Sequence, residues 1–485
     1  MSKRARAVVA TAVLGVAAPV AVACPGMYAC VPSMCLEMER ASVRNHTGPG
    51  TPNAGLAATS MNMTLLAQMP LTSIGGTSTT DGSSLYAWVD PLTQREYALM
   101  GRSNGTAIVD VTNPTQPKYV ANVPPTGSQT LWREPKVYGN YMYVGVDGGS
   151  HRMQIVDLTQ VRNYAGTTMT INAATFGGTF NGLNVNNIHT LAINKDSGYL
   201  YLSGTSINSG APLVVDVRNP ATPVAAGMIP GGTGWDGYSH ETQIVVYHGP
   251  DRAYQGKEIM VSSNGKQGAT ADTLSIVDVS NKAAPRRISS KTYAQAGYIH
   301  QGWFTEDHRY FFEDDELDEP GVGNTRTHLW DMSDLDNPVY RGFYTHPRAS
   351  VDHNLYVRGN YLFEANYTTG VRVFKIGDLT STTPSNWLTE VAFYDTYAPS
   401  DAATFNGAWN VYPWLPSGNI VVSDIDGGLF VLGLNLPYEG PPIGDNIKPI
   451  RFGENIGQLL PEPGSIGLLA VAGAGVLLRR RGAAR

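Results

Sequence analysis

Short apolar runs recur along the chain at intervals of about fifty residues, and they keep a fixed order. One set is rich in aromatic and branched residues: 97–100, 141–144, 199–202, 259–261, 310–312, 361–363 and 420–422. A second set follows it, and its first four copies contain Val-Asp: 107–111, 154–158, 213–217, 275–279, 329–332, 371–374 and 429–432. Runs this short, bounded by Gly, Asn and Pro, predict buried strands and not helices.

One further position recurs in each unit before these two runs, and an apolar residue follows it four positions later. Histidine occupies this repeated position in four successive units: His189, His240, His300 and His353. The remaining units place other residues there: Ser84, Arg133 and Gly407. The repeated position therefore brings together four of the ten histidines in the chain.

Seven units of four short strands predict an all-β fold, a seven-bladed β-propeller. A lone strand at 62–71 precedes the first unit, and the last unit ends after its third strand near Leu434. We expect the N-terminal strand to complete the last blade, because this pairing closes the ring and removes two open edges. An open solenoid is the alternative.

Composition agrees with short strands and tight turns. Charged residues make up 15% of the chain, and it contains 53 Gly, 31 Pro and 25 Tyr. The formal net charge is −6 and no basic cluster stands out. Nucleic acid is therefore not an expected partner.

The N-terminal residues predict export. Basic residues precede an apolar run at 7–22, and Ala21-Val22-Ala23 forms a cleavage site, so residues 1–23 are predicted to be a signal peptide. Residues 24–60 are predicted to be a linker, and it holds all three cysteines: Cys24, Cys30 and Cys35. These permit one disulfide with a remaining thiol, or a lipid on Cys24.

The C-terminal residues predict sorting to the surface. The propeller is expected to span 61–436, followed by a linker at 437–460 and a sorting signal at 461–485. That signal combines Pro461-Glu462-Pro463, an apolar run at 466–478 and a final arginine cluster, which resembles the PEP-CTERM signal that exosortases process. The apolar run is shorter than the roughly twenty residues of a stable span, which favours a short or transient membrane anchor.

The second set of strand runs resembles LVIVD repeats. Blocks similar to those of the choice-of-anchor B family occur at 236–241, 297–303, 324–328, 352–357 and 405–409. The likeness covers about residues 62–435. It implies an exported, surface-anchored protein with a propeller-like region, and it implies no particular reaction.

The histidine position is a candidate metal site. The first strand of each blade lines the channel of a propeller, so His189, His240, His300 and His353 are expected at one mouth. Such a cluster could bind one transition-metal ion and leave positions open for a ligand. Glu364 is a weaker candidate ligand beside His353. Alternatively, the histidines persist as latches that hydrogen-bond a neighbouring blade.

Carboxylates are expected at the same rim. Glu241, Asp315 and Glu316 are candidates for an acid/base group. Glu313 is expected to lie nearly opposite His300.

Other residues near the rim are candidates for binding an ion or a molecule. Calcium is an alternative occupant of the acidic run at 313–319. Arg133 could hold an anionic group. Trp303 and Trp409 could form an aromatic platform.

Three functions remain open. The first is a binding or interaction module whose small-molecule, glycan or protein ligand occupies the mouth. The second is a metal-dependent hydrolase or oxidase that uses the same histidines. The third is a structural component of an extracellular matrix. The predicted propeller contains no cysteine, and the chain has neither a Gly-x-Ser-x-Gly motif nor a phosphate-binding loop, so these common nucleophile and phosphate sites are not expected.

Overall fold

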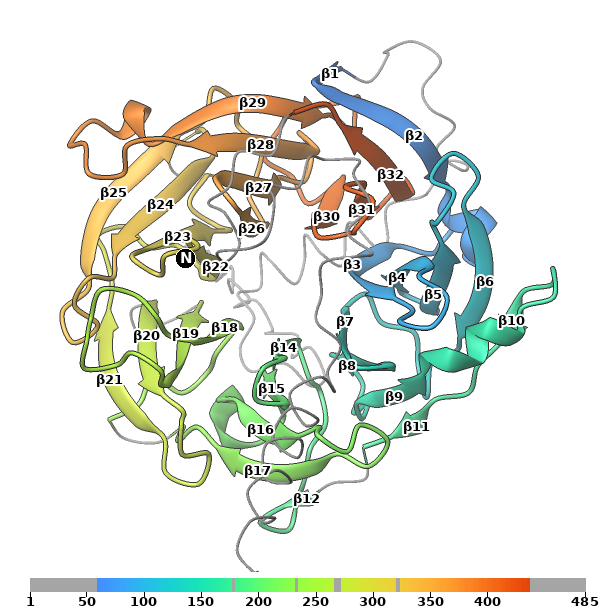
Figure 1. Cartoon of the computed structure of the whole chain (residues 1–485), viewed down its shortest axis with the longest axis horizontal. Helices are drawn as coiled ribbons and strands as arrows, with labels where there is room; N and C mark the ends of the chain where they lie inside the picture. The colour runs from blue at the N-terminus through green and yellow to red at the C-terminus, as the bar shows by residue number, and fades with distance from the viewer. Residues whose placement is uncertain (1–58, 177–178, 232–233, 266–271, 320–322, 437–485) are drawn as a thin grey trace, which may run out of the picture.

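The computed structural model describes residues 59–436, apart from 177–178, 232–233, 266–271 and 320–322. The described residues form seven sheets arranged in a ring around a central channel (Figure 1). This arrangement confirms the predicted seven-bladed β-propeller. Within each complete blade, consecutive strands pair antiparallel from the channel outward.

The strands follow the predicted order. Blades one and two contain β3 (Gly82–Val89), β4 (Glu96–Arg102), β5 (Gly105–Asp110) and β6 (Lys118–Val123), then β7 (Arg133–Tyr138), β8 (Tyr141–Val146), β9 (Gln154–Asp157) and β11 (Ala174–Thr175). Blades three and four contain β14 (Thr190–Asn194), β15 (Tyr199–Ser203), β16 (Leu213–Asp216) and β17 (Val224–Met228), then β18 (Glu241–Val246), β19 (Glu258–Asn264), β20 (Thr273–Asp278) and β21 (Arg286–Lys291).

The last three blades complete the ring. Blade five contains β22 (Ile299–Phe304), β23 (Tyr310–Asp315), β24 (Arg326–Asp331) and β25 (Val339–Thr345). Blade six contains β26 (Asn354–Arg358), β27 (Tyr361–Ala365), β28 (Val371–Ile376) and β29 (Leu388–Tyr394). Blade seven contains β30 (Ala408–Tyr412), β31 (Ile420–Asp424) and β32 (Gly428–Leu434), together with β2 (Met63–Met69) from the N-terminal side.

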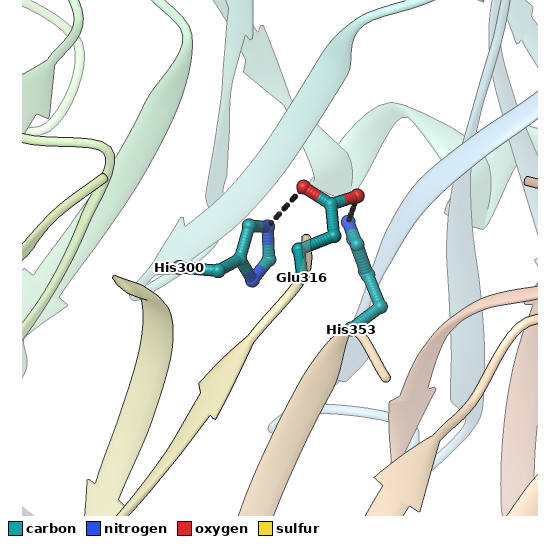
Figure 2. Close-up of side chains that lie close together, drawn as sticks. All are labelled: His300, Glu316 and His353. Atoms are coloured by element: carbon teal, nitrogen blue, oxygen red, sulfur yellow. Dashed lines mark ion pairs between the residues drawn. The ribbon is translucent and has the colours of Figure 1, made fainter. Parts of the chain in front are cut away.

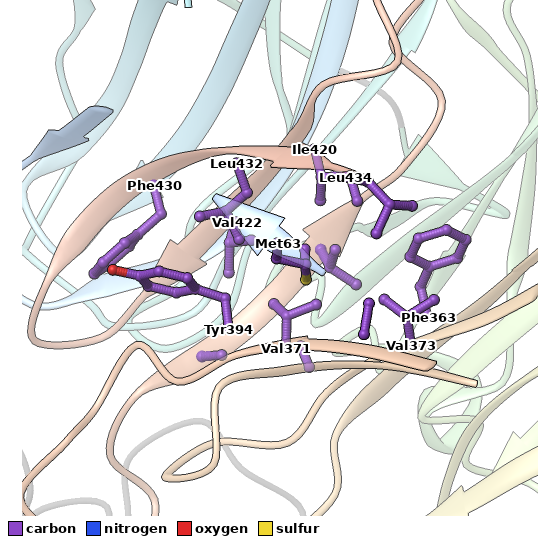
Figure 3. Packing of buried hydrophobic residues seen from close by; sticks show 14 of the residues in the cluster. Met63, Phe363, Val371, Val373, Tyr394, Ile420, Val422, Phe430, Leu432 and Leu434 are labelled. Atoms are coloured by element: carbon purple, nitrogen blue, oxygen red, sulfur yellow. The ribbon is translucent and has the colours of Figure 1, made fainter. Parts of the chain in front are cut away.

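The core lies between blades. The second strands are buried along nearly their whole length, because each blade packs face to face against its two neighbours. The outer strands are more exposed, as in β25. Figure 3 shows one cluster in which Met63 packs with residues of blades six and seven, among them Val371, Val422 and Leu434.

The ring closes as predicted. β2 pairs antiparallel with β32, from Met63 opposite Leu434 to Met69 opposite Leu429. The preceding strand β1 (Ser60–Met61) pairs with β29 of blade six. The N-terminal segment therefore joins the last two blades and not the last one alone.

Blade two departs from the regular pattern. After β9 the chain forms the 3-10 helix η2 (Leu158–Asn163), and β10 (Met169–Thr170) then adds in parallel to β6 of blade one. Asp157 caps η2 by accepting a hydrogen bond from the backbone of Thr159, while the buried Leu158 and Val161 hold it on the core. A small hairpin, β12 (Thr179–Phe180) with β13 (Leu183–Asn184), precedes blade three.

Among residues 59–436, as far as they are described, no helix is long and apolar enough to cross a membrane. The predicted signal peptide, the cysteines and the C-terminal sorting signal lie outside the described residues.

Candidate functional site

Four histidine rings from four consecutive blades lie side by side in one continuous row. The ring centroids of His189 and His240 are 4.4 Å apart, those of His240 and His300 4.4 Å, and those of His300 and His353 4.3 Å. Each histidine stands at or just before the first strand of its blade, β14, β18, β22 or β26. The repeat spacing thus becomes physical proximity at the channel.

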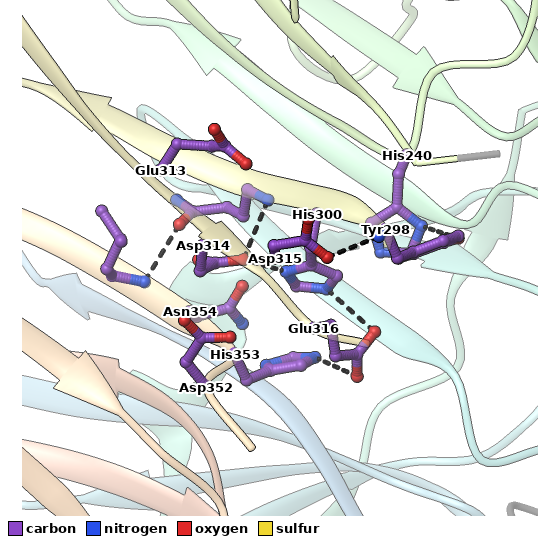
Figure 4. Close-up of polar contacts among 12 residues, drawn as sticks. His240, Tyr298, His300, Glu313, Asp314, Asp315, Glu316, Asp352, His353 and Asn354 are labelled. Atoms are coloured by element: carbon purple, nitrogen blue, oxygen red, sulfur yellow. Dashed lines mark hydrogen bonds and ion pairs between the residues drawn. The ribbon is translucent and has the colours of Figure 1, made fainter. Parts of the chain in front are cut away.

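Each of these histidines uses its Nδ1 atom to contact the fold. The distances are 2.9 Å from His189 to Asp147, 2.8 Å from His240 to the hydroxyl of Tyr298, 2.8 Å from His300 to Asp314, and 2.6 Å from His353 to the carbonyl of Trp409. Figure 4 shows Tyr298 beside His240 and Asp314 beside His300.

This pattern leaves Nε2 for other contacts. A carbonyl oxygen only accepts hydrogen bonds, so Nδ1 of His353 carries its proton and Nε2 carries the lone pair. Metal-binding histidines are commonly oriented in this way. Nδ1 of His189, His240 and His353 reaches a group from an adjoining blade or from the segment that leads into it, as the latch alternative expects, and this contact does not use Nε2.

Glu316 lies between two of the histidines. Its Oε2 is 3.8 Å from Nε2 of His300, and its Oε1 is 3.8 Å from Nε2 of His353 (Figure 2). The hydroxyl of Tyr367 donates to Oε1 at 2.8 Å. One donor atom from each of His300, Glu316 and His353 lies within 4.8 Å of the other two, so these three residues form a potential metal-binding set.

Burial controls the charge of this set. It lowers the pKa of His300 well below the usual value for an imidazole and lowers that of His353 to about 3. It also raises the pKa of Glu316 to about 7. The two histidines are therefore neutral at neutral pH, which is the form that binds a metal ion.

A small cavity opens beside the row of rings. Its lining residues come from all blades: Ser83, Ser84, Trp132, Arg133, Glu134, His189, Thr190, His240, Glu241, His300, His353, Asn354 and Trp409. The repeated position predicts that blade seven contributes Gly407 to the channel mouth. In the structure the residue of blade seven that lines the cavity is Trp409. A bulge in β30 between Ala408 and Asn410 explains the difference, because a bulge redirects the side chains around it.

Two of the predicted polar residues line this cavity. Burial raises the pKa of Glu241 to about 8, although the charge of Lys136 acts in the opposite direction. Arg133 is 1% exposed, its Nη1 donates to Gln154 at 3.4 Å, and burial lowers its pKa to about 10. Nε and Nη2 of Arg133 are buried and have no hydrogen-bond partner in the described part of the chain.

Other candidate residues lie elsewhere. Asp315 accepts hydrogen bonds from Tyr293 and from the backbone of Gly297, within blade five. Glu313 pairs across the sheet with Gly302 and not with His300, and Trp330 and Tyr293 donate to its two oxygens. The expectation that Glu313 lies opposite His300 was wrong, because the regular pairing of β22 with β23 places Glu313 two residues farther along, opposite Gly302.

Glu364 and Trp303 are also outside the row of rings. Thr327 and Asn366 donate to the carboxylate of Glu364, and Nε2 of His346 is 3.5 Å from it. Trp303 packs edge-on against Tyr356, with ring centroids 5.1 Å apart, and does not line the cavity described above.

The supporting residues were missed from the sequence. Asp147 follows β8 directly, near the position at which Asp315 and Asp424 end the equivalent strands of blades five and seven, and this position was a usable signal. Asp314 stands inside the acidic run that was already noted. Tyr298 and Tyr367 have no signal of this kind, because their contacts to His240 and Glu316 depend on tertiary packing.

Comparison with known sequences identifies repeats. A family model described as LVIVD repeat matches residues 95–124, 134–159 and 269–291, in blades one, two and four. The chain therefore contains LVIVD repeats, which confirms that part of the sequence interpretation. No curated protein matches the chain significantly.

Solved structures resemble the fold at low sequence identity. The Cps50 (Swd1) β-propeller domain of Myceliophthora thermophila is 11% identical, covers 76% of this chain and 99% of its own, and gives a TM-score of 0.46. The periplasmic gluconolactonase PpgL of Pseudomonas aeruginosa is 12% identical, with coverage of 69% and 90% and a TM-score of 0.45. A hypothetical selenium-binding protein from Sulfolobus tokodaii is 11% identical, with coverage of 74% and 91% and a TM-score of 0.47. At this level none of them indicates a function for this chain.

Proposed function

We propose that this protein is an exported, surface-anchored propeller that binds a transition-metal ion at the histidine-lined mouth and a ligand in the adjoining cavity. The observation that carries the proposal is the convergence of donor atoms from His300, Glu316 and His353 within 4.8 Å. The apolar N-terminus and the PEP-CTERM-like C-terminus support export and an exosortase-type partner.

The donor set suits a metal with open coordination positions. Two imidazoles and one carboxylate are typical of catalytic zinc sites and of non-haem iron sites, where water or substrate completes the coordination. His240 adjoins His300 and is the nearest further imidazole. His240, His300 and His353 all line the cavity, so a metal ion bound by these histidines would contact a molecule that occupies the cavity.

The test is metal content. The full chain is freed of metal with a chelator, dialysed against zinc and analysed by elemental mass spectrometry. The variant carrying His300→Ala and His353→Ala is expected to hold one equivalent less than the wild type. The exposed His248 provides the control, and His248→Ala should retain the wild-type content. Equal zinc in the double variant and the wild type would refute the proposal.

A metal-dependent hydrolase or oxidase is the second candidate, and Glu241 is the observation that favours it. Its carboxyl lines the same cavity, and its raised pKa of about 8 leaves it largely protonated at neutral pH and able to donate a proton. The zinc-loaded protein would be assayed with a chromogenic ester, and the copper-loaded protein with a phenol and with dioxygen as the oxidant, because zinc has no redox chemistry. If either reacts, Glu241→Gln should lower turnover about 100-fold while metal content is unchanged. Turnover that survives this substitution would exclude Glu241 as the acid/base group.

A further inference from the structure

A second group of possible metal ligands lies in the wall of blade five. Asp315 ends β23, Asp318 lies in the turn that follows, and His328 is on β24. One donor atom from each lies within 4.8 Å of the other two, and all three residues are buried. The neighbouring residues Asp315 and Glu316 therefore belong to different groups: Asp315 lies with Asp318 and His328, whereas Glu316 lies between His300 and His353 at the mouth.

Asp318 has an unsatisfied oxygen in this group. Its side chain is 3% exposed, and its buried Oδ1 has no hydrogen-bond partner among the described residues. Its Oδ2 is 3.4 Å from Nε2 of His328 and 3.5 Å from Nη1 of Arg326. A buried carboxylate oxygen without a donor destabilises the folded protein, and a cation would satisfy it.

His328 is held in an orientation that suits a ligand. Its Nδ1 is 2.8 Å from the hydroxyl of Tyr340, and its ring stacks on Tyr293 with centroids 4.6 Å apart. When Nδ1 donates its proton to Tyr340, the Nε2 lone pair faces an oxygen of Asp318, so a proton or a metal ion must lie between them.

The spacing favours the metal ion. The 3.4 Å between His328 and Asp318 exceeds the about 2.7–2.9 Å of a charge-assisted hydrogen bond. Two ligands of a tetrahedral zinc ion are about 3.3 Å apart, given metal–ligand bonds of about 2.0 Å.

We propose that Asp315, Asp318 and His328 form a second metal site, for a divalent ion of the zinc class. The imidazole distinguishes this site from a calcium site, which takes oxygen ligands and which the acidic run alone suggested. Glu313 is not part of this group, because only Asp315, Asp318 and His328 bring donor atoms within 4.8 Å of one another here. The ion would tie the turn that carries Glu316, and so hold that side chain toward His300 and His353.

The test uses the full chain with the mouth disabled by His300→Ala and His353→Ala, stripped of metal and dialysed against zinc. We expect one equivalent of zinc to remain, and we expect addition of Asp318→Asn to remove it. Asp196→Asn, at an exposed turn of blade three, is the matched control and should leave it in place. The test of this site is independent of the proposed function. The zinc lost when the mouth is disabled tests the proposed function, and the further zinc lost on Asp318→Asn tests the second site.

Three results would overturn the second site: a mouth-disabled chain that holds no zinc, equal zinc with and without Asp318→Asn, or retention of calcium in place of zinc. If the Asp318→Asn chain fails to fold, as judged by circular dichroism, His328→Gln replaces it. The visible absorption spectrum of cobalt bound to the mouth-disabled chain gives a second measurement, in a protein whose turn at Asp318 is not mutated. We expect the intense absorption bands of tetrahedral cobalt.

Discussion

Each histidine at the mouth contacts the fold through Nδ1 of its ring. In His300, Nδ1 contacts Asp314 at 2.8 Å while Nε2 faces Glu316 at 3.8 Å. Asp314 also accepts a hydrogen bond from the backbone of Gln301 on the same oxygen, Oδ1. Asp314 therefore positions the imidazole of His300, and it would act on the proposed metal ion only through that ring.

Replacement of this carboxylate should weaken metal binding without abolishing it. Asp314→Ala removes the acceptor that orients His300, so zinc affinity at the mouth should fall about 10–100-fold. Competition with a chromogenic chelator measures the change. Asp196→Ala, in an exposed turn of blade three, should leave the affinity unchanged. Equal affinities in the two variants would contradict the role given to Asp314.

At the scale of elements, neighbouring blades approach so closely that a single glycine sets the distance. A Cβ on Gly227 of β17 would lie 1.8 Å from the carbonyl oxygen of Lys282 in blade four. Lys282 cannot retreat easily, because its Nζ binds Glu258 at 2.8 Å and both side chains are buried.

Gly227→Ala should therefore force the two blades apart. We expect a loss of about 1–3 kcal/mol in the free energy of unfolding, as for other overpacked sites. Gly433 gives the control, since a Cβ there would meet only side-chain atoms of Leu66 at 3.4 Å or more. Urea denaturation of both variants measures the difference, and a Gly227→Ala protein as stable as Gly433→Ala would show that the blades can adjust.

An ion pair joins blades one and two on the outside. Arg162 of η2 binds both oxygens of Asp90, at 2.9 Å and 2.5 Å, in the turn between β3 and β4. The Asp90 side chain is fully buried and that of Arg162 is 27% exposed. The guanidinium is the main reason that the pKa of Asp90 falls to about 2.

The stabilisation from Asp90 should depend on pH. Because its pKa is lower in the folded protein, its contribution is complete above about pH 4 and is lost as pH falls toward 2. The shift corresponds to about 2 kcal/mol after allowance for the partly exposed arginine. Asp90→Asn should therefore be less stable than the wild type at pH 7, and the difference should shrink below about pH 4. Urea denaturation at several pH values checks this, and a difference independent of pH would rule out the ion pair as its source.

For the whole molecule, stability depends on the closing strand. β2 pairs with β32 over most of its length, and Met63 is buried in the core between blades six and seven (Figure 3). Without β2, the edge of β32 would be open to pairing with other chains.

Truncation tests this closure. A chain that starts at residue 71 should melt about 10 °C lower, or lower still, than a chain that starts at residue 59, and it should aggregate as the open edge pairs. Both chains lack the N-terminal residues that precede the described structure, so residues 59–70, which include β1 and β2, are the only difference between them. Thermal unfolding followed by circular dichroism gives the comparison. Equal melting temperatures would mean that the ring holds without its N-terminal strand.

Much of this architecture follows from the sequence. The number of blades, the order of strands and the closing strand follow from repeated apolar runs, because burial between blades demands the same pattern in each unit. The proximity of His189, His240, His300 and His353 follows from the same repetition, since equivalent positions of successive blades face one channel.

The partners of those histidines were decided only by the tertiary structure. Glu313, Asp314, Asp315 and Glu316 are consecutive acids, yet Asp314 and Glu316 contact His300 while the other two face the interior of blade five. A bulge at His300 shifts the pairing by one residue, and a one-residue shift reverses the face to which every side chain points. Repetition in a sequence fixes where strands meet, whereas an irregularity such as this bulge determines which side chain reaches the site.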